Sequence, residues 1–207
     1  MNKDIRMPGV EEGRRAVGGK LARTRDSIIA ATMGLALAGQ AAPVVRDVAD
    51  ASGVSARTVF QHFTDTEHLY LEVLGRVLLG LVSGIPEPAA GGLLAERIGI
   101  VVEHRAARFE QWLAIWPFVD TLQRRSSAAL DQVQRLYTVG RVRLAQWLDP
   151  ELARLPERER DHVLNAAAAL LTPEGWIVLR QRLGLTPEEA RDVWQAHVTR
   201  LVGGRPA

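Results

Sequence analysis

Apolar residues recur every three or four positions along most of the chain, which is the period of a helix that buries one face. In the first part of the chain this pattern predicts helices over 21–38, 45–52 and 56–63, and a fourth that Thr64 or Asp65 caps and that extends to Leu81. No stretch keeps the period of two that indicates a half-buried strand. We therefore predict an all-α protein with helices packed on helices.

The clearest break in this pattern lies at 84–92, where prolines and paired glycines favour a loop or a domain boundary. Beyond it we predict helices over 93–107, 109–116, 128–148, 157–183 and 186–202, with an interruption near Thr172–Pro173. The segment 118–125 is either a short turn or the start of the next helix. Thr186-Pro187-Glu188-Glu189 is a capping signature for the last helix. The expected organisation is a basic, flexible arm at 1–19, a first domain at 20–83 and a second helical domain at 84–207.

The segment 45–63 predicts a helix-turn-helix. Gly53 follows Ala49 by four residues and can adopt the left-handed conformation that ends a helix. Ser55 can then cap a second helix. We expect the buried stripe of that helix to comprise Ala56, Val59, Phe60 and Phe63.

The opposite face of the second helix carries hydrogen-bonding side chains three or four positions apart, namely Arg57, Thr58, Gln61 and His62. A helix held away from the body with such groups outward fits a DNA major groove of about 12 Å. The pattern alone is equally typical of any glycine-linked helix pair with a solvated face.

From about Lys20 to Leu81 the chain resembles the DNA-binding domain of the TetR family of bacterial transcription regulators. The matching segments are Arg-Asp-Ser-Ile-Ile-Ala-Ala at 25–31, Val-Arg-Asp-Val-Ala at 45–49, the turn at 52–55, and 58–63 followed by Leu69. The resemblance implies a two-domain fold with an amino-terminal helix-turn-helix domain and a second domain for ligand binding and dimerisation. It implies DNA contacts from Arg46, Ser55, Ala56, Arg57, Thr58, Phe60, Gln61 and His62.

Three positions depart from the family's usual residues. Phe60 stands where a tyrosine whose hydroxyl reaches phosphate is usual, and Thr66 stands where a lysine is common. Val44 occupies a position where a capping threonine is frequent. Each change weakens the expected contacts with the DNA backbone rather than the fold.

The distribution of charge matters more than the net charge, which is +2. Residues 1–25 contain seven basic and three acidic groups, whereas 26–83 contain three basic and six acidic groups. Because phosphate neutralisation supplies most non-specific affinity for DNA, the arm is the expected source of cations. The candidates are Arg14, Arg15, Lys20 and Arg23, although the same composition is typical of a disordered, solubilising tail.

The last two predicted helices have the apolar surface expected of a subunit interface. Small residues precede Leu170, and several large apolar residues follow, more than a terminal hairpin can bury alone. An ordinary monomer core would have the same pattern, but the family resemblance implies a homodimer through a four-helix bundle. The candidate interface residues are Ala166, Leu170, Trp176, Leu179, Trp194 and Val198.

The middle helices could enclose a pocket for a small-molecule effector, which the resemblance also implies. His104, Arg108 and Trp112 share one stripe if their helix is continuous, and Trp116 extends it. Phe118 and Tyr137 could complete the wall. Such aromatic residues at helical spacing are more often part of a core, so both interpretations stay open.

Catalytic motifs are absent from the sequence. It contains no cysteine, no His-Glu-x-x-His and no glycine-rich phosphate loop, so we expect no enzyme activity, metal or cofactor. No apolar run approaches the ~20 residues that span a bilayer, and we expect a cytoplasmic protein. The predicted function is a dimeric, effector-released repressor of a near-palindromic, double-stranded operator. The alternative is a helical ligand- or protein-binding module that does not bind DNA.

Overall fold

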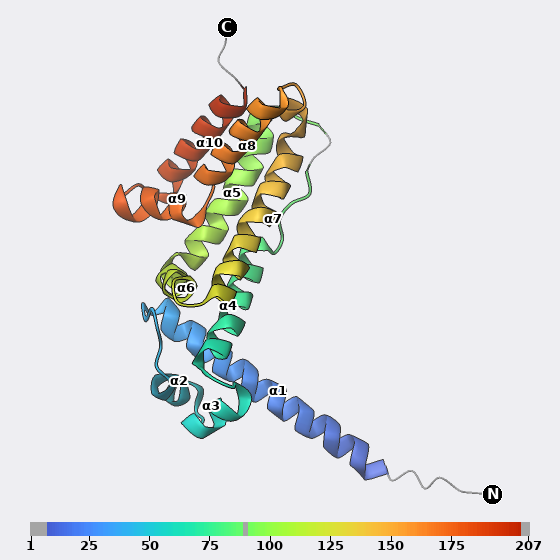
Figure 1. Cartoon of the computed structure of the whole chain (residues 1–207), viewed down its shortest axis with the longest axis vertical. Helices are drawn as coiled ribbons and strands as arrows, with labels where there is room; N and C mark the ends of the chain where they lie inside the picture. The colour runs from blue at the N-terminus through green and yellow to red at the C-terminus, as the bar shows by residue number, and fades with distance from the viewer. Residues whose placement is uncertain (1–7, 89–90, 204–207) are drawn as a thin grey trace, which may run out of the picture.

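The computed structural model describes residues 8–88 and 91–203, with side chains from residue 19 onward. Within these ranges the regular structure is entirely helical, which confirms the predicted fold class. The molecule is elongated, with α1 to α3 at one end and the bundle of α5, α7, α8 and α10 at the other (Figure 1). Helix α4 runs from the first part into the second. None of the helices described combines the length and apolar character that a membrane-spanning segment needs.

The first part consists of α1 (Pro8–Leu37), α2 (Val45–Ser52), α3 (Ala56–His62) and α4 (Thr66–Val82). Helix α1 buries Ile28, Ile29, Thr32 and Ala36 against its neighbours, as its apolar period predicts. Helix α4 is capped by Asp65, whose carboxylate accepts a hydrogen bond from the His68 backbone N–H at 2.7 Å. Apart from the start of α1, the boundaries of these helices lie within one or two residues of those predicted.

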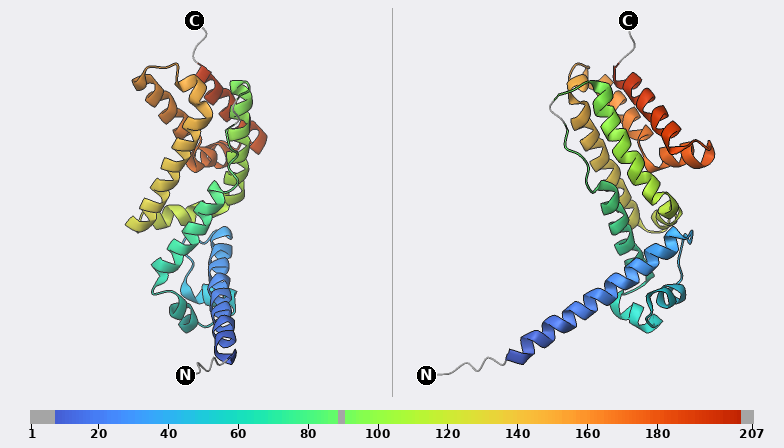
Figure 2. Two further views of the ribbon diagram at one scale, coloured as in Figure 1. Left: turned by 90° about the vertical axis from the view of Figure 1, so that its right-hand side faces the viewer. Right: turned by 180° about the vertical axis from the view of Figure 1, so that it is seen from behind.

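The start of α1 differs from the prediction. A helix from Leu21 preceded by a flexible arm at 1–19 was expected, but α1 begins at Pro8 and projects from the body as one long rod (Figure 2). Proline suits the first turn of a helix, and the glutamates, arginines and alanine that separate the glycines of 9–19 favour helix. The part of the predicted arm at 1–7 lies outside the described residues.

The second part contains α5 (Leu94–Trp112), the 3₁₀ turn η1 (Leu113–Ile115), α6 (Trp116–Gln123), α7 (Ser127–Leu152), α8 (Glu157–Leu170), α9 (Pro173–Ile177), the π-helical turn η2 (Val178–Arg182) and α10 (Pro187–Gly203). Helix α5 is continuous where a break near residue 108 was expected. Helix α7 includes Pro150, which was expected to follow its end, because a proline in the last turn removes only one backbone donor. The predicted capping box at Thr186 and Glu189 is present.

Two apolar cores fill the molecule. The first joins α1 to α4 with η1, α6 and the start of α7, and the second joins α5, the end of α7, α8, α9 and α10. The first core therefore continues past residue 83, where the domain boundary was expected. Tyr70 of α4 contacts both sides of this boundary. Its ring meets Phe118 of α6 edge to face with centroids 5.2 Å apart, and its hydroxyl donates to the Pro43 carbonyl.

Helices α4 and α5 approach closely at Gly80. A Cβ at this position would lie 2.7 Å from a ring carbon of Trp112, so only glycine fits without movement. We expect Gly80→Ala to lower the free energy of unfolding by about 1–2 kcal/mol, because overpacking outweighs the higher helix propensity of alanine.

Gly75 of the same helix is the matched control, since nothing lies within 4 Å of the position of its Cβ. Gly75→Ala should raise the free energy of unfolding by about 0.5–1 kcal/mol. Urea denaturation of both variants measures the difference, and equal effects would contradict the close approach of the two helices.

Candidate nucleic-acid interface and internal cavity

The turn between α2 and α3 has the predicted geometry. Gly53 adopts φ 70° and ψ 26°, the left-handed conformation, and the Val54 N–H returns to the Ala49 carbonyl at 3.1 Å. Ser55 then caps α3 by accepting a hydrogen bond from the Thr58 N–H at 3.1 Å. Helix α2 has no side-chain cap at Val44, which agrees with the expected loss of a threonine there.

Helix α3 buries only a narrow edge, formed by Val59 and Phe63. The sequence-based stripe also included Ala56 and Phe60, and that part of the prediction is wrong: both are exposed, Phe60 by 51%. A helix of seven residues makes fewer than two turns, so two buried side chains four positions apart are enough to pack it against the rest of the domain. Ala56 and Phe60 consequently belong to the outward surface.

That outward surface also presents Arg57 and Gln61, both exposed. Thr58 is half-buried, and its hydroxyl lies 2.9 Å from that of Ser55. His62 is half-buried at the end of α3. Arg46 extends from α2 into solvent, with 84% of its side chain exposed and its Nε 3.5 Å from Asp47.

Arg25 of α1 holds the end of α3 in place. Its guanidinium donates to the His62 carbonyl at 2.6 Å, lies 4.2 Å from the centre of the Phe63 ring and pairs with Glu72 of α4 at 3.2 Å. Asp26 pairs with Arg76 one turn further along α4. We call Arg25, Asp26, Glu72 and Arg76 the α1–α4 seam. Two of the acidic groups that made this part of the chain net negative, Asp26 and Glu72, are thus paired with arginines of the seam.

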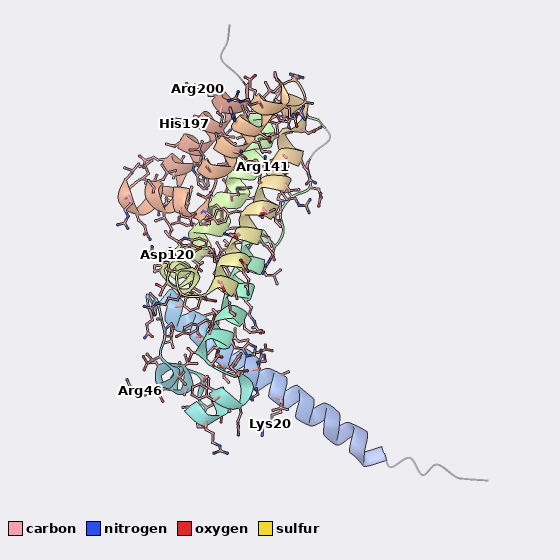
Figure 3. All side chains as sticks on the ribbon, viewed as in Figure 1. Lys20, Arg46, Asp120, Arg141, His197 and Arg200 are labelled. Carbon is pink, nitrogen blue, oxygen red and sulfur yellow. The ribbon has the colours of Figure 1, made fainter. Side chains whose placement is uncertain are left out.

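The predicted basic contacts lie along α1. Lys20 and Arg23 are exposed, and Figure 3 shows Lys20 and Arg46 at the same end of the molecule. The backbone of Arg14 and Arg15 belongs to α1, but their side chains lie outside the described residues.

The second part of the molecule contains a cavity of about 310 Å³. Its wall comes from the end of α4 and the loop after it, from α5, from the middle of α7 and from the α8–α9 connection. Leu81 and Val82 contribute the α4 side, so the helix that begins beside α3 ends at this cavity.

Of the residues predicted to line a pocket, His104 and Tyr137 do so and four do not. Trp112 and Trp116 border a separate gap of about 10 Å³. Phe118 is buried in the first core, and Arg108 lies outside the cavity, 3.4 Å from Gln111. Arg108 and Trp112 fall outside the cavity although α5 is continuous, because each step of four residues turns a side chain about 40° around the helix. Trp116 fails because α5 becomes a 3₁₀ turn after Trp112, and its ring packs in the first core with α1 and α4.

Sequence reasoning missed several cavity residues, and Arg105 is the most informative of them. It follows Ile98, Val101 and Val102 on the buried stripe of α5, so a cation on an apolar stripe was the available signal. Phe109, Leu144 and Trp147 supply further apolar wall.

The electrostatics of the cavity are set by burial. Desolvation, with smaller effects from Arg108 and Arg105, lowers the pKa of His104, so its imidazole is neutral at pH 7. Burial also lowers the pKa of the Arg105 guanidinium to about 10, which leaves it protonated. Burial and the neighbouring Glu174 carboxylate raise the pKa of Tyr137, so its phenol stays neutral.

The predicted interface residues divide into two groups. Trp176, Trp194 and Val198 are buried within the chain itself and offer no surface to a second subunit, which corrects the prediction for them. Helix α5 covers the apolar face of α10 that was thought to be left open, and the Trp176 and Trp194 rings lie 4.8 Å apart. Ala166 and Leu170 are exposed on α8, and Leu179 is half-buried.

Comparison with known proteins agrees with this architecture. Residues 28–73 match the sequence model of the family described as bacterial regulatory proteins, tetR family. A tetR-family transcriptional regulator from Streptomyces coelicolor is similar with a TM-score of 0.71 and 19% identity, over 87% of this chain and 80% of that one. A transcriptional regulator from Rhodococcus sp. Rha1 is similar with a TM-score of 0.64 and 17% identity, over 86% and 95% of the two chains. Among curated protein sequences none matches significantly.

The contacts of Arg25 predict that Arg25→Ala loosens α3. Loss of the bond to the His62 carbonyl, the ion pair and the stacking on Phe63 should lower the free energy of unfolding by about 1–2 kcal/mol. Amide hydrogen exchange should accelerate in α3. Arg23→Ala, an exposed position two residues away, is the control and should change stability by less than about 0.5 kcal/mol. Unchanged exchange in α3 after loss of Arg25 would refute this role.

Proposed function

We propose that this chain, whose residues 28–73 match the tetR family of bacterial regulatory proteins, is a transcriptional repressor that binds a near-palindromic DNA operator as a homodimer and is released by a small-molecule effector. The observation that carries the proposal is the exposed polar face of α3. The left-handed turn and Arg25 hold this face away from the body, on the same helical framework that reaches the cavity.

In this proposal α3 enters the major groove. Arg46 and Arg57 are the groups suited to guanine edges, and Thr58 and Gln61 to bases or the nearby backbone. Ser55 and His62 contact phosphate. Ala56 and Phe60 present apolar surface that suits a thymine methyl group.

Phosphate neutralisation falls mainly to α1, whose Lys20 and Arg23 are exposed. We extend the same role to Arg14 and Arg15. The acidic residues of the α1–α4 seam do not oppose this, because Asp26 and Glu72 are paired with Arg76 and Arg25.

The route from ligand to DNA follows named contacts. Leu81 and Val82 of α4 line the cavity, and Glu72 of the same helix pairs with Arg25, which bonds to the end of α3. A ligand that fits one position of α4 better than another would shift α3 and reduce operator affinity by that difference in binding energy.

A homodimer requires an unoccupied face on the second part. With Trp176, Trp194 and Val198 excluded by their burial, we propose that Ala166 and Leu170 of α8 contact the partner, with Leu179 at the edge. A two-fold axis there would place two copies of α3 on one side of the DNA, as a near-palindrome requires.

The first test of this proposal concerns Arg57. Fragments of bacterial genomic DNA captured by the purified protein would supply the operator. On that DNA, Arg57→Ala should weaken binding by about 1–3 kcal/mol and relax the preference for the base pair that Arg57 contacts. Arg154→Ala, which removes an exposed arginine from the turn after α7, is the charge-matched control and should leave affinity unchanged. Failure to enrich any fragment, or equal effects of the two substitutions, would refute DNA recognition by α3.

The second test concerns subunit association. Introducing a charge at the proposed interface with Leu170→Glu and Ala166→Glu should convert the dimer to a monomer in light scattering, because two buried carboxylates would face each other across the axis. Leu79→Glu alters an exposed leucine of α4 and should leave the dimer intact. A wild-type monomer at working concentrations would overturn the dimer proposal.

A further inference from the structure

We propose that the cavity binds a small apolar carboxylic acid whose carboxylate pairs with Arg105. This inference deepens the proposed function and rests on it only for the regulatory consequence, because binding itself requires no DNA. It follows from four observations: a desolvated guanidinium with no acidic partner among the described residues, an adjacent imidazole nitrogen with no partner among them, a wall whose described residues include no acid, and the apolar character of the remaining surface.

Arg105 differs from the other inward-facing arginines of this part of the molecule. Arg97 pairs with Glu151, and Arg180 pairs with Glu110 at 2.8 Å. Arg105 lines the cavity, but its guanidinium meets only backbone carbonyls, those of Leu171 at 2.6 Å and Gly140 at 2.9 Å. Within the described part of the chain no carboxylate lies within 4 Å of it. A buried charge without a counter-ion is costly, and an anionic ligand would offset that cost.

His104 adds a second unsatisfied group on the same wall. Its Nε2 is buried and has no hydrogen-bond partner among the described residues. Since the imidazole is neutral, this nitrogen either donates one hydrogen bond or accepts one, depending on the tautomer. As a donor it would serve a carboxylate oxygen, and as an acceptor it would serve a hydroxyl of the ligand. Buried polar atoms are normally paired, so its isolation points to a group that is supplied from outside the chain.

The charges around the cavity favour an anion over a cation. Its wall contains Arg105, Arg141 and Arg143 and no aspartate or glutamate. Arg141 pairs with Asp161, and Arg143 pairs with Glu87, but both acids are largely exposed and face solvent outside the wall. Glu174, which accepts a hydrogen bond from Tyr137, is also exposed. Water screens these three acids far more than it screens Arg105.

The rest of the wall requires an apolar ligand body. Val101, Phe109, Leu136, Leu144 and Trp147 contribute side chains to it. A volume of about 310 Å³ is at the lower end of small-molecule sites, which span about 300–1,000 Å³. The guanidinium of Arg105, which no carboxylate of the described residues pairs with, balances one carboxylate, whereas a phosphate ester would bring further charge.

Binding of matched acids and amides tests the proposal. Octanoate and 2-naphthoate are titrated into the full-length protein without DNA and compared with octanamide, 2-naphthamide and octylamine, by calorimetry and by tryptophan fluorescence, since Trp147 borders the cavity. At least one acid should bind at least tenfold more tightly than its amide, and octylamine should not bind. The proposal is overturned if both acids fail to bind at millimolar concentration, if amide and acid bind equally, or if the amine binds more tightly.

Substitutions then place the carboxylate. Arg105→Gln should reduce acid affinity to that of the amide, whereas Arg105→Lys should retain part of the preference for the acid. Arg108→Gln, on the same helix but outside the cavity, should have no effect. If both Arg105 variants fail to fold, the acid-to-amide ratio of the wild-type protein decides. A wild-type preference for acid that survives Arg105→Gln in a folded protein would overturn the assignment of Arg105.

Release from DNA separates this inference from the proposed function. Acids that bind in the cavity without changing affinity for captured operator DNA would support the ligand class and contradict effector control. Release by neutral or cationic compounds alone, with no binding of the acids, would support effector control and overturn the ligand class.

Discussion

The structure depends on the burial of α4 from several sides. Val73, Leu74 and Val77 are almost completely inaccessible because α1, α5 and α7 pack around one helix. Its first half completes the core beneath the helix-turn-helix, and Leu81 and Val82 at its other end form one side of the cavity. A helix confined in this way cannot adjust to one neighbour without affecting the others, since packed interiors change between discrete arrangements rather than deform gradually.

Charge is arranged around this helix so that the surface of α3 stays free. Three of the acidic residues in this part of the chain are used internally: Asp65 caps α4, while Asp26 and Glu72 pair with arginines of the α1–α4 seam. Individually such partly exposed pairs contribute about 0–1 kcal/mol. The pair of Arg25 with Glu72 matters more for the position of α3 than this energy suggests, because Arg25 also contacts His62 and Phe63 at the end of α3.

Features that depend on residues close together in the sequence could be predicted from it, and features that depend on distant residues could not. The all-α class, the turn at Gly53 and the Ser55 cap follow from residues within one helical turn of each other, and the structure has all three. The exposure of Phe60 could not be predicted, because apolar periodicity does not show how many positions of a short helix are buried. Trp147 lines the cavity, whereas Trp116, which was predicted to, does not. This outcome depends on the 3₁₀ turn after Trp112 and on packing between residues far apart in the sequence, which no local pattern encodes.

The shared helix has a further consequence for degradation. Because the first core joins α4 to α6 and the start of α7, the first part cannot keep its apolar surface covered once the second part unfolds, and the two should unfold together. Removal of the chain after residue 84 would strip α4 of its contacts with α5 and α7. A protease that removes the second part would therefore unfold the first as well, rather than leave behind a stable amino-terminal fragment.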